Sequence, residues 1–236
     1  MLFRSGLAVY FARRIVVPEN QPEDLDILHV SGFDDELVIH LPATEHTILP
    51  GTYGITFDNG RGLAQVGEIL EYDPGSRTVA RRIASVMSGD LTAARRGRWT
   101  GTVFTHPSQL DIPYEDIVLQ SDVGELPAWL LPTAASVPLD TWAILVHGRG
   151  ATRAEVLRAG RVLDSIGMPS IAMSYRNDAE VRDGGHSRYG LGDTEWFDVD
   201  VAIDYARAQG ARQVVVFGWS MGGAIAFQAS RRTTHP

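Results

Sequence analysis

The 236-residue sequence contains no cysteine and no lysine. Without cysteine there is no thiol nucleophile, no disulfide and no thiolate metal ligand. All 21 basic residues are arginine, so a lysine general base, a Schiff base and the lysine of a phosphate-binding loop are also excluded. Positive charge is scarce, because 29 acidic residues leave a net charge of −8. Nucleic acids and anionic membranes require clustered positive charge, so we expect neither as a partner.

Long apolar runs are also missing. The segment Met1 to Ala12 is apolar but is interrupted by Arg4, whereas a membrane-spanning helix needs about 20 apolar residues. It lacks the cleavage site of a signal peptide as well, so we predict a first strand or the remainder of a longer element. The expected location is cytoplasmic. The alternative is a membrane-anchored parent protein, if the N-terminus is incomplete.

The first part of the chain, residues 1–110, is predicted to be a small β-rich region. Runs such as TYGITF and QVGEILEY are typical of strands, and they predict an antiparallel meander. The turn signals between them are Pro50-Gly51, Asp58-Asn59-Gly60, Asp73-Pro74-Gly75 and Ser88-Gly89. A hairpin is predicted next, over 114–132, with its turn at Asp122 to Gly124.

The second part, residues 111–236, changes after Asp140 to an α/β pattern. The runs WAILVHG, PSIAMSY and QVVVFG predict parallel strands that are buried on both faces. Between them, residues 153–167 and 194–210 have helical periodicity and end at Gly167 and Gly210, where glycine favours a helix C-cap. Strands that alternate with helices indicate a parallel sheet with covering helices.

One turn of this region carries a chemical signal. Residues Gly218 to Gly222, GWSMG, fit the pattern G-x-S-x-G between a strand and an Ala/Gly-rich helix. In that context the serine adopts a strained conformation that only small neighbours permit, and its hydroxyl projects above the sheet edge. Ser220 is therefore the candidate nucleophile. The alternative is a glycine-rich packing turn that happens to contain serine.

A second turn, His147-Gly148-Arg149-Gly150, ends the first long strand. Attack on an acyl carbon places negative charge on its oxygen, and backbone N–H groups can stabilise that charge. The candidate donors are the N–H of Met221, which begins a helix after the serine, and the N–H of Arg149 in the other loop. The alternative for His147-Gly148 is an ordinary strand-end turn.

The order VHGRG, helix, strand, FGWSMGG resembles the α/β-hydrolase superfamily of serine esterases, lipases, thioesterases and peptidases. The hairpin with PAWLLP and the stretch YGLGDTEWFDVDVAIDYA resemble bacterial members described as α/β hydrolases or lysophospholipase-like proteins. The resemblance covers about Tyr114 to Ser230. It implies an incomplete α/β-hydrolase parallel sheet that is truncated after the helix following the serine. It also implies a small-molecule acyl substrate and no cofactor.

The resemblance implies an acid and a histidine after the serine, but only 16 residues follow Ser220. His235 would lie on the order of 20 Å away along a helix, too far for a base. His186, in a glycine-rich loop at the same sheet edge, is the only upstream alternative, and a solvated loop residue is the preferred interpretation. We therefore predict that the partners of Ser220 lie outside this chain, which is interpreted as a fragment.

Other polar residues have structural interpretations. The remaining histidines are expected at the surface or in turns, and no two histidines have a metal-binding helical spacing, so no metal site is predicted. Asp193 is interpreted as a helix N-cap, with Glu195 in the first turn. Trp219 and Phe217 flank the serine. One of them could wall an acyl pocket, and core packing is an equal alternative for Phe217.

The resulting hypothesis is a serine hydrolase that cleaves esters or thioesters through an acyl-enzyme on Ser220 and is inactive as this fragment. One alternative is a serine peptidase of the same fold. Another is a non-catalytic relative that uses the fold for binding. The sequence does not indicate the substrate or the oligomeric state.

Overall fold

The computed structural model describes residues 2–17, 22–33, 36–181 and 188–234. The chain divides into two compact units. One unit contains residues 21–103, and the other contains residues 1–20 together with residues 104–236. The two units are described separately below.

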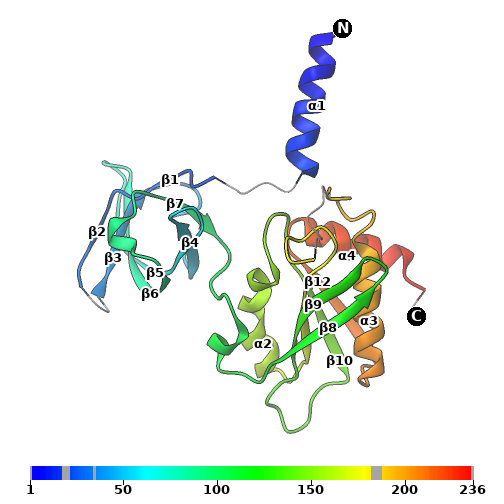
Figure 1. Ribbon diagram of the computed structural model, residues 1–236. Coiled ribbons are helices and arrows are strands. Elements are labelled where there is room, and N and C mark those ends of the chain that lie inside the picture. Colours follow the sequence, from blue (N-terminus) through cyan, green and yellow to red (C-terminus); the bar gives the residue numbers. More distant parts are fainter. Residues whose placement is uncertain (1, 18–21, 34–35, 182–187, 235–236) are drawn as a thin grey trace. The chain divides into compact units, whose positions relative to one another are not determined.

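The unit of residues 21–103 is a seven-stranded antiparallel sheet in the order β1-β7-β4-β5-β6-β3-β2 (Figure 1). Register shifts between β5 and β6 mark bulges, which bend a sheet. Strands β4, β5 and β6 form the predicted meander. The strands are β1 (Leu25–Asp26), β2 (His29–Ser31), β3 (Val38–Pro42), β4 (Tyr53–Phe57), β5 (Gly62–Asp73), β6 (Thr78–Ser88) and β7 (Arg96–Thr100).

A buried arginine lies among the apolar residues of this unit. The side chain of Arg81, on β6, is fully buried, and its guanidinium donates to the carbonyl oxygens of Thr47, Leu49, Gly51 and Gly67. It also lies over the rings of Tyr53 and Trp99, at 5.5 and 5.4 Å from their centroids. The planar fork of arginine thus satisfies several backbone carbonyls at once, which explains how the charge is tolerated in the core.

The N-terminal segment is a helix, so the prediction of a first strand is wrong. Helix α1 spans Leu2–Val16. The alternation of a strand is absent from LFRSGLAVYFARRIV, whose alanine, leucine and arginine residues favour a helix. None of the described helices is both long and apolar enough to cross a membrane.

The second unit contains a five-stranded sheet in the order β12-β10-β11-β9-β8 (Figure 1). Only β12, β10 and β11 run parallel, whereas β9 pairs antiparallel with both β11 and β8. The predicted parallel sheet is therefore a mixed sheet, because the predicted hairpin joins its edge instead of standing apart. The strands are β8 (Glu115–Ser121), β9 (Gly124–Leu131), β10 (Thr141–Val146), β11 (Ser170–Met173) and β12 (Gln213–Gly218).

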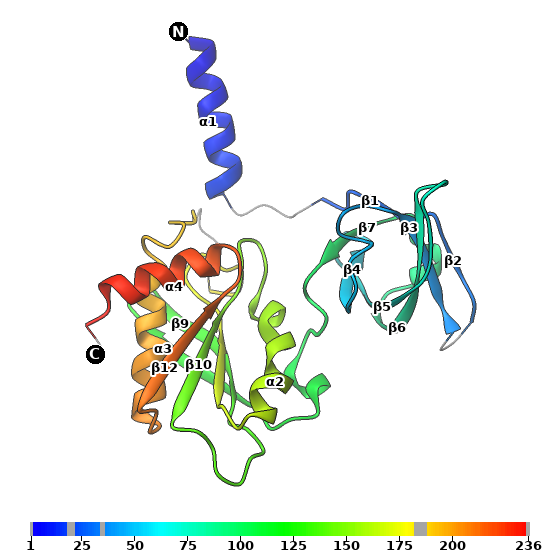
Figure 2. The same cartoon turned by 180° about the vertical axis from the view of Figure 1, so that it is seen from behind.

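Helices cover both faces of this sheet, which makes the unit α/β. Alternate side chains of β10 face opposite sides: Ile144 packs with α3 (Trp196–Ala208) and α4 (Met221–Arg232), whereas Leu145 packs with the 3-10 helix Arg153–Ala159 and α2 (Gly160–Ser165). Figure 2 shows the sheet with β12 and β10 toward the viewer. The predicted helices are thus present, and Gly167 and Gly210 adopt positive φ just beyond their ends.

Strand β12 departs from its predicted burial. It forms one edge of the sheet, and Val215 and Phe217 are each 40% exposed. The apolar run QVVVFG predicted burial on both faces, as is found for β11. Within the described part of the chain, no strand pairs with the outer edge of β12.

Candidate active site

Three loops meet at one edge of the five-stranded sheet. In the parallel pairing, Val146 lies opposite both Met173 and Gly218, so the C-terminal ends of β10, β11 and β12 are level. This confirms the prediction that the strands before His147 and Ser220 run parallel and end on the same edge. Polar residues that follow these strands can therefore form one site.

Ser220 has an unusual backbone conformation in the turn between β12 and α4. Its φ and ψ are 50° and −114°, in a region that residues with side chains rarely adopt. The predicted strain is therefore present. The neighbouring glycines are required by close approach, since a Cβ on Gly218 would collide with the carbonyl oxygen of Gly222, and one on Gly222 with that of Val146. The turn thus holds α4 directly against the end of β10.

The loop after β10 lies against this serine. A Cβ built on Gly148 would lie 3.2 Å from the Cβ of Ser220 and 3.2 Å from the carbonyl oxygen of Trp219. Residues 72 positions apart in the sequence are thus in near contact, and a side chain at Gly148 would fit only if the turn at Ser220 moved slightly. Ser220 itself is exposed at this edge.

The backbone N–H groups of the loop have different partners. Gly148 donates to Glu155 Oε2 at 2.8 Å, Gly150 to the Tyr189 hydroxyl at 3.2 Å, and Ala151 to the Gly148 carbonyl at 3.2 Å. Among the described residues, no acceptor is present for the N–H of Arg149 or for that of Met221. Both N–H groups that the sequence predicts as oxyanion donors therefore lack an acceptor within the described part of the chain.

The side chain of Arg149 contacts the end of α1. Its Nη1 donates to the carbonyl oxygens of Arg14 at 3.0 Å and Ile15 at 3.4 Å, at the end of α1. A guanidinium at this end satisfies free carbonyls and suits the helix dipole. The side chain of Arg149 is therefore engaged at the end of α1, and only its backbone N–H remains as the predicted donor.

A buried network behind the loop was not predicted. His147 is fully buried, and its Nε2 lies 2.9 Å from Oδ2 of Asp178, which also accepts from the N–H of Tyr175 at 2.9 Å. The ring of Tyr175 stacks on that of His147, with centroids 4.3 Å apart. The signal that could have identified these residues is the polar run SYRND directly after the strand beside β10.

The ring nitrogens of His147 both face oxygen atoms. Nδ1 lies 2.9 Å from the carbonyl oxygen of Gly148, which can only accept a hydrogen bond. Burial is the largest single influence and opposes the charged imidazolium, but the Asp178 carboxylate, the Gly148 carbonyl and Glu155 together raise the pKa of His147. Burial also raises the pKa of Asp178, although the charge of His147 and its hydrogen bond oppose that rise. We assign the pair as imidazolium and carboxylate, because each ring nitrogen then donates to an acceptor.

The acidic residues before α3 differ from their predicted roles. Asp193 does not cap α3, since its carboxylate pairs with Arg232 at 2.7 Å and the N-cap position is Glu195. The buried Glu195 side chain instead accepts from the N–H groups of Gly190 and Gly192, at 2.6 and 2.9 Å. Glu195 therefore stabilises the loop that carries Tyr189, which in turn bonds to the loop after β10.

The residues around the serine divide between surface and core. Trp219 packs against the apolar cluster beneath α2, whereas Phe217 is exposed on the edge strand, so core packing is wrong for Phe217.

His186 and His235, the two alternatives for a base, lie outside the described residues. In the described ranges, no group of three or more His, Asp or Glu side chains could hold a metal ion.

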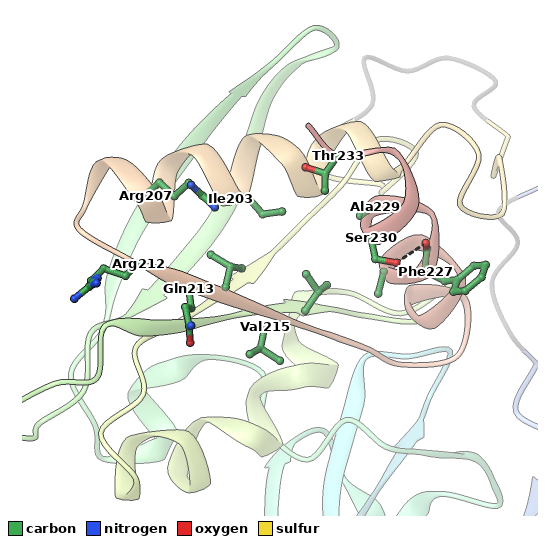
Figure 3. A pocket seen from close by; sticks show the side chains of 12 residues that line it. Ile203, Arg207, Arg212, Gln213, Val215, Phe227, Ala229, Ser230 and Thr233 are labelled. Atoms are coloured by element: carbon green, nitrogen blue, oxygen red, sulfur yellow. Dashed lines mark hydrogen bonds between the residues drawn. The ribbon is translucent and has the colours of Figure 1, made fainter. Parts of the chain in front are cut away.

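A groove with a volume of about 670 Å³ lies near this site but does not include Ser220. It runs along β12 between α3 and α4, and Figure 3 shows Val215, Ile203 and Phe227 around it. Its lining is mainly apolar because β12 is an edge strand whose side chains are only partly covered. The groove is thus a property of the sheet edge rather than of the serine turn.

Comparisons with known proteins give one family match and several similar solved structures. Residues 27–100 match a family described only as a domain of unknown function, DUF8805. No curated protein matches the chain. The solved structures similar to it include an esterase from Pyrococcus furiosus, with 21% identity, a TM-score of 0.45 and coverage of 52% of this chain and 48% of that chain.

Two further solved structures give similar values. A serine hydrolase without a lid from Xanthomonas campestris has 21% identity and a TM-score of 0.42, with coverage of 50% of this chain and 56% of that chain. An α/β serine hydrolase homologue from Coxiella burnetii has 17% identity and a TM-score of 0.42, covering 51% and 58%. The chain thus spans about half the length of these structures. At such TM-scores, the chemistry of the site has to be derived from its own geometry.

Proposed function

We propose that the protein is a serine hydrolase that cleaves carboxylic esters or thioesters through an acyl-enzyme on Ser220. The observation that carries the proposal is the backbone of Ser220, which is strained at φ 50° between a strand end and a helix start and lies against Gly148. Strain of this kind persists where the surrounding structure enforces it, and it occurs often at active sites.

In the proposed reaction, the Ser220 hydroxyl oxygen attacks the acyl carbon while a base accepts its proton. The N–H groups of Arg149 and Met221 stabilise the negative oxygen that forms, and each such donor contributes about a hundred- to a thousandfold in rate. Collapse of the intermediate expels the alcohol or thiol, which takes the proton, and water then hydrolyses the ester on Ser220. We propose that the histidine and its acid are supplied by residues outside this chain.

Labelling with a fluorophosphonate tests the nucleophile. We expect the full-length protein to be labelled, and Ser220→Ala to abolish the label without loss of folding. Ser230→Ala is a matched control, because Ser230 lies on the same helix with its hydroxyl bonded to the Phe227 carbonyl at 2.9 Å. Labelling that persists in Ser220→Ala would refute the assignment of the nucleophile, whereas an unmodified protein that is never labelled would favour a binding role for the fold.

An ester assay on the 236-residue chain tests the source of the base. We expect no turnover of a short-chain activated ester above the solvent background, because the proposal assigns the base to residues outside this chain. Steady turnover that His186→Ala abolishes would place the base in the loop that contains His186.

A further inference from the structure

The buried residues behind the loop after β10 have no role in the proposed reaction as described above. They are His147, Tyr175 and Asp178, which we call the loop-anchoring network. His147 and Asp178 are 0% and 4% exposed, so neither can contact a substrate directly. Three separate contacts from this network nevertheless end on the carbonyl groups of the loop itself.

The carbonyl of Gly148 is the main target of these contacts. It accepts from Nδ1 of His147 at 2.9 Å and lies 3.3 Å from the Tyr175 hydroxyl. Burial and the nearby Asp178 carboxylate raise the pKa of Tyr175, so its hydroxyl keeps its proton and can donate. The oxygen of Gly148 is therefore held toward the protein interior.

Peptide geometry transmits this constraint to the next residue. The C=O of Gly148 and the N–H of Arg149 belong to one planar trans unit, in which they point in opposite directions. Holding the oxygen toward His147 therefore turns the N–H of Arg149 away from the interior. That N–H has no acceptor among the described residues, unlike those of Gly148, Gly150 and Ala151.

We propose that Asp178 and Tyr175 are positioning residues, which act through the His147 imidazolium to aim the N–H of Arg149 at the oxyanion formed on Ser220. This inference deepens the proposed function and rests on it. A neutral His147 could donate from only one ring nitrogen, so its bond either to Asp178 or to the Gly148 carbonyl would be lost, although each acceptor has another donor. The carboxylate of Asp178 is thus what keeps the second donor available.

The protonation of His147 can be tested in the 236-residue chain without any reaction. In a nitrogen NMR spectrum at about pH 8, an ordinary histidine is neutral, but we expect both ring nitrogens of His147 to be protonated. His147→Gln assigns the signals. Asp178→Asn should convert His147 to the neutral form and shift the backbone amide of Arg149. Glu155 and Glu180 also face the pair, so they are left unchanged. A neutral His147 in the unmodified chain overturns the proposal.

The effect on the reaction is measured as the rate of fluorophosphonate labelling of Ser220 in the full-length protein. We expect Asp178→Asn to slow the maximal rate about 10- to 100-fold, with little change in the probe concentration for half-maximal rate. Tyr175→Phe, which keeps the stacked ring, should slow it less. If Asp178→Asn fails to fold, Tyr175→Phe and the ring spectrum decide the question.

Asp198→Asn is the matched control. Asp198 is another fully buried carboxylate, but it binds Arg176 and Ser121 and makes no contact with the loop after β10. It should destabilise the protein and leave the labelling rate unchanged. An equal loss of rate in Asp178→Asn and Asp198→Asn would mean that Asp178 acts only through stability, which overturns the inference. If Ser220 is never labelled, the proposed function fails, and the ring spectrum alone decides on the positioning.

Discussion

Two adjacent glycines at the start of α4 should respond in opposite ways to the same substitution. An alanine Cβ at Gly222 would collide with the carbonyl oxygen of Val146 and lie 2.7 Å from that of His147, closer than Cβ atoms approach backbone. Neither oxygen belongs to a flexible side chain. At Gly223 the same Cβ would meet only the carbonyl oxygen of Gly218, at an ordinary 3.6 Å.

The expected magnitudes follow from these contacts. Overpacking costs about 1–3 kcal/mol. Both carbonyl oxygens that the new Cβ would meet at Gly222 belong to the backbone, so we expect Gly222→Ala to lower the free energy of unfolding by about 2 kcal/mol or more. Gly223→Ala should raise it by up to about 1 kcal/mol, because alanine favours a helix over glycine. For a chain of this size, these values correspond to a fall of about 4–8 °C and a rise of about 2–4 °C in Tm.

Thermal unfolding followed by far-UV circular dichroism measures both variants, and urea unfolding gives the free energies. The unmodified protein and the double variant complete the comparison. If Gly222→Ala is as stable as the unmodified protein, α4 does not begin against the end of β10, and the described geometry around Ser220 is refuted.

Three further predictions concern stability. Arg81→Lys should lower the free energy of unfolding of its unit in urea by about 2–4 kcal/mol, because one ammonium group cannot replace a guanidinium bonded to four carbonyls. Arg82→Lys is the control. Since Arg82 forms an exposed ion pair, this change should alter the stability by less than about 0.5 kcal/mol. Partial burial and the neighbouring His29 lower the pKa of His40. The contribution of neutral His40 to the free energy of unfolding is therefore present above the unfolded pKa of about 6.5 and is lost as the pH falls below that value. Unfolding measured at decreasing pH should show this loss of stability, and His29→Gln should make it smaller. Ser220→Gly should be more stable than Ser220→Ala by about 1 kcal/mol in thermal unfolding, because only glycine relieves the positive φ; equal stability would argue against strain at this turn.

The sequence by itself determined the local features of the second unit. The strained turn at Ser220 was predictable because the small residues around it are adjacent in the chain. The helices between the strands were predictable because their apolar periodicity is local. Parallel pairing of the strands before His147 and Ser220 followed from the helical connections, which allow little else.

Tertiary structure alone decided how distant segments combine. The sequence predicted the hairpin 114–132 but not its partner in the sheet; β9 joins β11, which makes the sheet mixed. The exposure of β12 could not be predicted from the sequence either, because an apolar strand has the same composition at the edge of a sheet and in its interior.

The same distinction applies to the site. Ser220 and the loop after β10 were identified from their glycines, which act on the backbone nearby. Asp178 was missed because its partner His147 lies 31 positions away, and no periodicity links two residues on separate strand ends. Their contact exists only because β10 and β11 run parallel and end level, so that a carboxylate after one strand meets an imidazole after the other.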